Sequence, residues 1–131
     1  MSSPTTPILL IEEEPTLLEI TAFRLELLGY QVIRHETARA AFDWLRDQLP
    51  KLIAVGHMAD MKPVDFLNRL SNDSRTNALP VIYISACSDL EEVQRVFNAG
   101  VDEYLVTPYD PLMLEQKVGS LLLAASNRGD G

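Results

Sequence analysis

The 131-residue chain carries 11 basic and 19 acidic residues, and its formal net charge of −8 argues against nucleic acid or an anionic membrane as its partner. Its length and its hydrophobic content of 47% predict one globular domain, and no apolar run is long enough to span a membrane. The single cysteine, Cys87, excludes an internal disulfide and favours a cytoplasmic location.

Five short apolar segments alternate with five amphipathic segments along the chain. The predicted strands are 8–11, 31–34, 51–56, 81–84 and 104–106; the predicted helices are 16–28, 38–49, 64–70, 90–99 and 111–125. This alternation predicts an α/β fold with a parallel sheet and helices on both faces. We expect one domain over 8–125, a loose leader over 1–7 and a frayed tail over 126–131.

The helices differ in how deeply they are expected to pack. Apolar residues cover a wide arc of helix 16–28, so we expect that helix to expose little apolar surface. In the fourth helix, Leu90 and Phe97 are expected to face inward with Val93 and Val96. Leu112, Met113 and Leu123 lie off the apolar stripe of the last helix, and a cluster there would mark a binding face.

The run 51–56 is the predicted centre of the sheet, because it is apolar throughout and bounded by Pro50 and His57. Ligands of open α/β sheets bind beyond the carboxyl ends of such strands. Gly56 stands at that end and offers no functional side chain.

Several motifs together resemble the receiver domain of two-component response regulators. They are ILLIEEEP at 8–15, LGYQV at 28–32, LPVI at 79–82 with Ser85-Ala86, and AGVDEYL at 99–105 with Thr107-Pro108. The resemblance implies a flavodoxin-like, doubly wound, five-stranded parallel sheet of order 2-1-3-4-5 with five helices.

The resemblance also implies positions for a phosphorylation site. Receivers carry a phospho-accepting aspartate after the third strand and a lysine after the fifth; these positions fall on Gly56 and Thr107. The acidic pair that helps hold Mg²⁺ falls on Glu12 and Glu13. The switch hydroxyl falls on Ser85, the switch aromatic on Tyr104, and the family's cis peptide on Thr107–Pro108.

A receiver with these two replacements lacks a nucleophile, and its acids alone would hold Mg²⁺ poorly. We therefore expect no catalytic residue, no bound metal, no cofactor and no enzymatic activity. Asp60 as a substitute acceptor would leave too short a loop before the next helix. His57 is expected to swing toward the vacant position or to stay solvated, and one of Glu12 and Glu13 to have a raised pKa or to turn outward.

Two smaller alternatives stay open at the ends of the fourth and fifth strands. Ser85 is either a remnant of the switch or a strand-end hydroxyl bonded to backbone, and Tyr104 is expected to be a half-buried packing residue. Cys87 lies near the site without a neighbouring base or cation, which favours an inert thiol.

The function expected from this resemblance is that of an atypical receiver, or pseudo-receiver, acting through protein–protein contact in two-component signalling. The partner would be a signalling kinase, a regulator or an attached output domain, bound through the fourth helix, fifth strand and fifth helix, with a homodimer as a variant. The alternative is a degenerate receiver that senses a small ligand in the emptied pocket.

Overall fold

The computed structural model describes residues 5–129 and contains five strands and five helices in strict alternation. The strands are β1 (Pro7–Ile11), β2 (Gln31–His35), β3 (Leu52–Val55), β4 (Val81–Ser85) and β5 (Glu103–Val106). The helices are α1 (Pro15–Leu27), α2 (Ala38–Leu45), α3 (Pro63–Asn72), α4 (Leu90–Asn98) and α5 (Pro111–Gly129).

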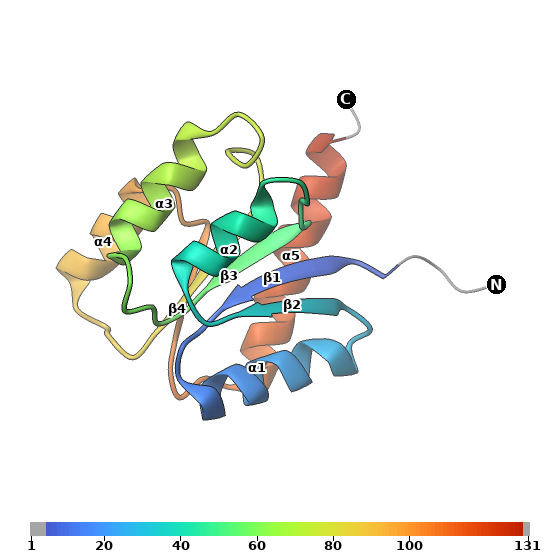
Figure 1. Cartoon of the computed structure of the whole chain (residues 1–131). Helices are drawn as coiled ribbons and strands as arrows, with labels where there is room; N and C mark the ends of the chain where they lie inside the picture. Colours follow the sequence, from blue (N-terminus) through green and yellow to red (C-terminus); the bar gives the residue numbers. More distant parts are fainter. Residues whose placement is uncertain (1–4, 130–131) are drawn as a thin grey trace.

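All neighbouring strands pair in parallel, and the order across the sheet is β2-β1-β3-β4-β5 (Figure 1). This is the flavodoxin-like order expected from the sequence. Because β3 is central and every one of its residues is buried, its apolar run needs no alternation with polar residues.

The core has two parts, one on each face of the sheet. Strand residues such as Leu9 and Ile53 pack with α2, α3 and α4, whereas their neighbours Ile8 and Leu52 pack with α1 and α5. Figure 1 shows the same separation of the helices into two layers. This division follows from the two-residue period of a strand, which sends successive side chains to opposite faces.

The helix ends follow local chemistry in most places. Thr37 accepts a hydrogen bond from Ala40 N at the start of α2, and Asp110 accepts one from Leu112 N at the start of α5. Asp89 occupies the N-cap position of α4 but makes no capping hydrogen bond with its side chain.

Several predicted boundaries are wrong. Helix α2 ends at Leu45 rather than Leu49, and Leu49 is exposed. Helix α5 runs to Gly129, four residues beyond the predicted end at 125. At the other end, Pro7 of the expected leader already belongs to β1; residues 1–4 and 130–131 lie outside the described residues.

The expectation that α1 exposes little apolar surface is also wrong. Ile20, Phe23 and Leu27 are exposed, since one stripe of the helix covers the sheet and no further layer covers the opposite stripe. The expectation that Leu90 and Phe97 of α4 face inward is wrong for the same reason. Both side chains are exposed, whereas Val96 is buried.

Candidate functional site

The carboxyl ends of β1 and β3 lie side by side. Ile11 pairs with Val55, and the next residues, Glu12 and Gly56, therefore leave the sheet at the same edge. Gly56 N donates a hydrogen bond to Ile11 O at 2.7 Å, so the two strands stay joined up to this point. In a sheet of this kind the edge is where a ligand would bind.

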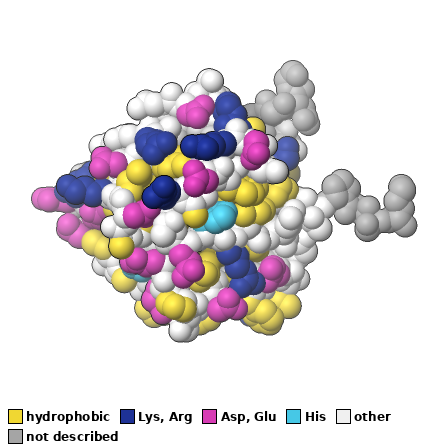
Figure 2. Space-filling view, viewed as in Figure 1, with side chains coloured by type: hydrophobic (Ala, Val, Ile, Leu, Met, Phe, Trp, Pro, Cys, Tyr) yellow, Lys and Arg dark blue, Asp and Glu magenta, His cyan; other side chains and the backbone are white. Residues whose placement is uncertain are grey.

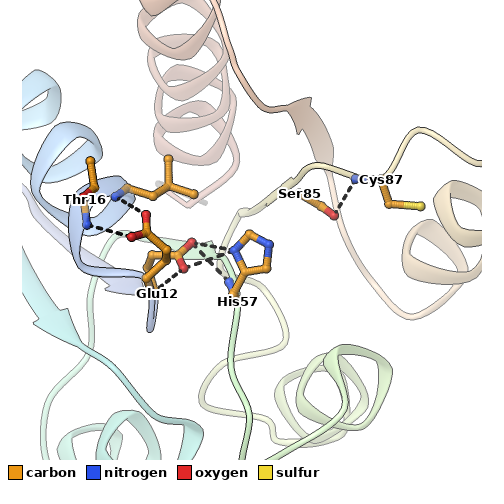
Figure 3. A network of polar contacts seen from close by, with 7 residues as sticks. Glu12, Thr16, His57, Ser85 and Cys87 are labelled. Carbon is orange, nitrogen blue, oxygen red and sulfur yellow. Dashed lines mark hydrogen bonds and ion pairs between the residues drawn. The ribbon is translucent and has the colours of Figure 1, made fainter.

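Glu12 is buried, with 2% of its surface exposed, and its carboxylate points toward His57 (Figure 3). The carboxylate accepts hydrogen bonds from Glu14 N at 2.9 Å and from His57 N at 3.2 Å. His57 Nδ1 lies 3.2 Å from one carboxylate oxygen and 3.1 Å from the other. The buried charge is thus compensated by fixed donors of the protein itself.

The carboxylate of Glu12 fills the space that a side chain at position 56 would need. A Cβ atom built on Gly56 would lie 2.2 Å from Glu12 Oε1 and 2.9 Å from Ile11 O. Both distances are shorter than van der Waals contact. Lack of space is therefore the reason for a glycine at this position. A left-handed backbone is not the reason, because the glycines with a positive φ in the described chain are Gly29 and Gly100.

The two adjacent glutamates have separate environments. Glu12 is buried and Glu13 is exposed. The expectation that one of the two glutamates turns outward is therefore confirmed. His57, expected either to enter the vacant position or to stay solvated, contacts Glu12 while its side chain remains 44% exposed. The pair Glu12–His57 closes the end of β3.

The donor set at this edge does not fit Mg²⁺. That ion requires a near-octahedral set of oxygen ligands, whereas Gly56 supplies no side-chain oxygen and both oxygens of Glu12 are engaged by N–H groups or His57. Among the residues that the structure describes, no three His, Cys, Asp or Glu side chains are placed to hold a metal ion.

Ser85 lies at the end of β4, apart from the Glu12–His57 pair (Figure 3). Its Oγ accepts a hydrogen bond from Cys87 N at 3.1 Å, which is the strand-end backbone bond left open by the sequence. Cys87 is exposed, and its carbonyl oxygen accepts a hydrogen bond from the Tyr104 hydroxyl at 2.5 Å.

Tyr104 is a half-buried packing residue, as expected. Its ring meets the Tyr83 ring edge-on, with centroids 5.3 Å apart. Burial raises the pKa of Tyr104 above its ordinary value and raises the pKa of Tyr83 to about 12. Both phenols are therefore protonated, and Tyr104 can donate the bond that holds the loop after β4.

The Thr107–Pro108 peptide bond is cis, as the resemblance implied. Thr107 N donates a hydrogen bond to Ser85 O at 3.0 Å, extending the β4–β5 ladder beyond the strand. In α5, which follows this segment, Lys117 forms an ion pair with Glu103 on β5.

Asp60 has a role that the sequence did not reveal. Its two carboxylate oxygens accept hydrogen bonds from Ala38 N at 2.9 Å and Arg39 N at 3.0 Å, and these donors lower the pKa of Asp60. The side chain thus caps α2 from the loop after β3. No local signal marks a cap of this kind, because the donors lie more than twenty residues earlier in the chain.

Within residues 5–129 no helix is both long and apolar enough to cross a bilayer.

Comparisons with known proteins agree with this architecture. The family model of the response regulator receiver domain matches residues 8–119. The response regulator Rre1 of Synechocystis is 32% identical over 93% of this chain and 53% of its own length. The phosphate regulon transcriptional regulatory protein PhoB of Escherichia coli is 28% identical over 88% of this chain and 51% of its own length. The chain spans about half the length of these curated relatives.

Solved structures show the same fold. A signal receiver domain of a histidine kinase from Syntrophus aciditrophicus superposes with a TM-score of 0.84 at 28% identity, covering 92% of both chains. A receiver domain protein from Methanospirillum hungatei superposes with a TM-score of 0.87 at 22% identity, covering 95% of this chain and 99% of the other.

Proposed function

Because the chain belongs to the response regulator receiver domain family, we propose that it is a pseudo-receiver in two-component signalling that works by binding proteins. It is not phosphorylated at the position that the family uses, and it is a binding domain rather than an enzyme. Neither a metal nor a cofactor takes part.

One observation carries this proposal: the carboxylate of Glu12 occupies the space beside Gly56. Phosphoryl transfer needs a nucleophilic oxygen in line with the donor, and the backbone of Gly56 supplies none. The side chain that would elsewhere help to hold a metal ion is instead buried against His57, with both oxygens engaged. An incoming phosphoryl group would meet a fixed negative charge at this place.

The end of β5 supports the same proposal. The lysine position of the family falls on Thr107, which offers no cation to pair with phosphoryl oxygens. Ser85, the switch hydroxyl position, is bonded to Cys87 N, and Tyr104 is bonded to Cys87 O. With these groups engaged locally, the conformation of the domain is set by partner binding instead of phosphorylation.

The proposed contact face is formed by α4, β5 and α5. These three elements expose six large apolar side chains: Leu90, Phe97, Val106, Leu112, Met113 and Leu123. Exposed apolar clusters mark protein contact sites. We propose a signalling kinase, a regulator or an attached output domain as the occupant of this face, or a second copy of the chain.

The alternative of a ligand sensor in the emptied pocket has less support. Two described cavities, of about 500 and 430 Å³, are lined by other residues, and neither includes Gly56 or Thr107. Glu12 and His57 fill the place that the ligand would need.

The decisive experiment is incubation of the full chain with acetyl phosphate and Mg²⁺, followed by intact-mass measurement. We expect no phosphoryl adduct, whereas a phosphorylatable receiver treated in parallel should gain one. A single stoichiometric adduct on any residue of this chain would refute the proposal.

The contact face is tested by comparing two charge insertions on exposed leucines. Leu112→Glu on α5 should weaken capture of the partner by the full chain, because it places a charge inside the proposed apolar face. Leu27→Glu on α1 is the matched control and should leave capture unchanged. The reverse result would move the contact face to α1.

A further inference from the structure

We propose that the cleft between α2 and α3 binds a small phosphorylated organic anion of nucleotide size. This site lies apart from the strand ends, and the inference does not depend on the proposed function. The cavity has a volume of about 500 Å³, within the range of sites for small molecules and cofactors.

Four arginines line the cleft: Arg39, Arg46, Arg69 and Arg75. They are four of only 11 basic residues in a chain of net charge −8. Figure 2 shows basic side chains gathered on the face that carries α2 and α3, with hydrophobic surface and some acidic side chains between them. Such a concentration, against the overall charge, favours an anionic ligand.

Two of these arginines are held in place by contacts that leave their charge uncompensated. The Arg69 guanidinium lies 3.8 Å from the centroid of the Phe42 ring, and Arg75 Nη1 donates to Leu45 O at 2.7 Å. Among the ion pairs formed by the described residues, none includes Arg39, Arg69 or Arg75. Preorganised guanidinium groups bind phosphate in a forked geometry.

Three aspartates, Asp43, Asp60 and Asp73, also line the cleft, and two of them accept hydrogen bonds from backbone N–H groups. Asp60 accepts from the first N–H groups of α2, and Asp73 accepts from Arg75 N at 2.8 Å. Asp43 lies 3.9 Å from Arg46 Nε, and both side chains are well exposed, so this pair is weak. The guanidinium groups therefore remain available to a ligand.

The remaining lining explains why the ligand should have an organic part. Phe42, Leu45, Met61 and Leu70 give the cleft an apolar floor beneath its basic rim. A flat ring on this floor would bring a phosphate within reach of the arginines. Inorganic phosphate would use only the rim.

Net charge favours a small ligand over an acidic protein. Charges separated by more than about 8 Å are largely screened at physiological ionic strength, so a ligand confined to the cleft interacts mainly with the local arginines. A large acidic partner would instead lie against the acidic remainder of the surface and be repelled.

The test is calorimetric titration of the full chain with ADP, GDP, adenosine, inorganic phosphate and a glutamate-rich peptide. We expect a nucleoside diphosphate to bind best, with adenosine and phosphate at least about tenfold weaker, since each lacks half of the contacts. Arg39→Ala should weaken the nucleotide about tenfold, and Arg95→Ala, which removes an equal charge on α4, should not.

Three results would overturn the inference. The first is no binding of either nucleotide at millimolar concentration. The second is equal weakening by Arg39→Ala and Arg95→Ala, which would indicate a non-specific charge effect. The third is tighter, Arg39-dependent binding of the peptide, which would assign the cleft to a protein partner. Arg46→Gln replaces Arg39→Ala if urea unfolding shows that the latter does not fold.

Discussion

The end of β3 and the cleft between α2 and α3 differ in what fills them. At the end of β3, where open α/β sheets usually bind ligands, Glu12 and His57 occupy the available space and satisfy each other. In the cleft, arginines surround a cavity of about 500 Å³, and Arg39, Arg69 and Arg75 belong to none of the ion pairs formed by the described residues. A fold's usual site can thus be closed by its own side chains while a different surface keeps the features of a binding site.

The largest expected effect comes from forcing a side chain into the closed end. Gly56→Ala should lower the free energy of unfolding by about 2 to 3 kcal/mol, because its Cβ would lie 2.2 Å from Glu12 Oε1 and 2.9 Å from Ile11 O. Urea denaturation of both proteins gives the difference.

Gly119→Ala is the matched control for that substitution. A Cβ atom at Gly119 in α5 would meet no atom within 4 Å, so alanine should raise the free energy of unfolding by up to about 1 kcal/mol. A neutral Gly56→Ala variant would mean that Glu12 moves aside freely and that the end of β3 is not closed.

The second prediction tests the buried carboxylate itself. Glu12→Gln keeps the size of the side chain but loses charge-assisted bonds to Glu14 N and His57, so the free energy of unfolding should fall by about 1 to 2 kcal/mol. The exposed neighbour gives the control, since Glu13→Gln should change stability by less than about 0.5 kcal/mol. Equal effects of the two changes would contradict the asymmetry of the pair.

The third prediction concerns Asp60, which joins the loop after β3 to the wall of the cleft. Asp60→Ala removes the acceptor for two N–H groups of α2 and should lower the free energy of unfolding by about 1 kcal/mol. Asp89→Ala should have almost no effect, because that N-cap side chain makes no capping bond. If thermal denaturation showed the same loss of stability for Asp60→Ala and Asp89→Ala, Asp60 would not be a cap of α2.

The smallest effect is a pH dependence near the closed end. Burial lowers the pKa of His35 from its ordinary value of 6.5, and its Nε2 is buried without a hydrogen-bond partner among the described residues. The folded state therefore binds this proton less readily than the unfolded state. The resulting stability is complete above pH 6.5 and is lost as the pH falls through the lowered pKa.

His35→Leu removes this titration. Unfolding free energies measured between pH 8 and pH 5, about one and a half units on either side of the ordinary value, should fall less steeply for the variant than for the parent. Parallel curves would show that His35 does not contribute.

Much of the architecture could be predicted because it depends on local patterns. Five apolar runs alternating with five amphipathic segments predict the elements and their order, since the strand and helix periods act over a few residues. The ends of α2 and α5 carry no strong local signal, and the structure places them at Leu45 and Gly129 rather than at the predicted residues 49 and 125. The apolar arc of α1 does not reveal whether another layer covers its outer stripe, and in the structure that stripe is exposed.

The sequence by itself determined that the chain folds as a receiver and that Gly56 and Thr107 follow its third and fifth strands, because the order of the apolar runs is read directly from the residues. Only the tertiary structure decided which side chains fill the end of β3 and which ones line the cleft between α2 and α3. The contact of Glu12 with His57 joins residues 45 positions apart, and the cleft gathers arginines from two helices and a loop. Such contacts depend on how the elements pack in space, which no local pattern of residues records.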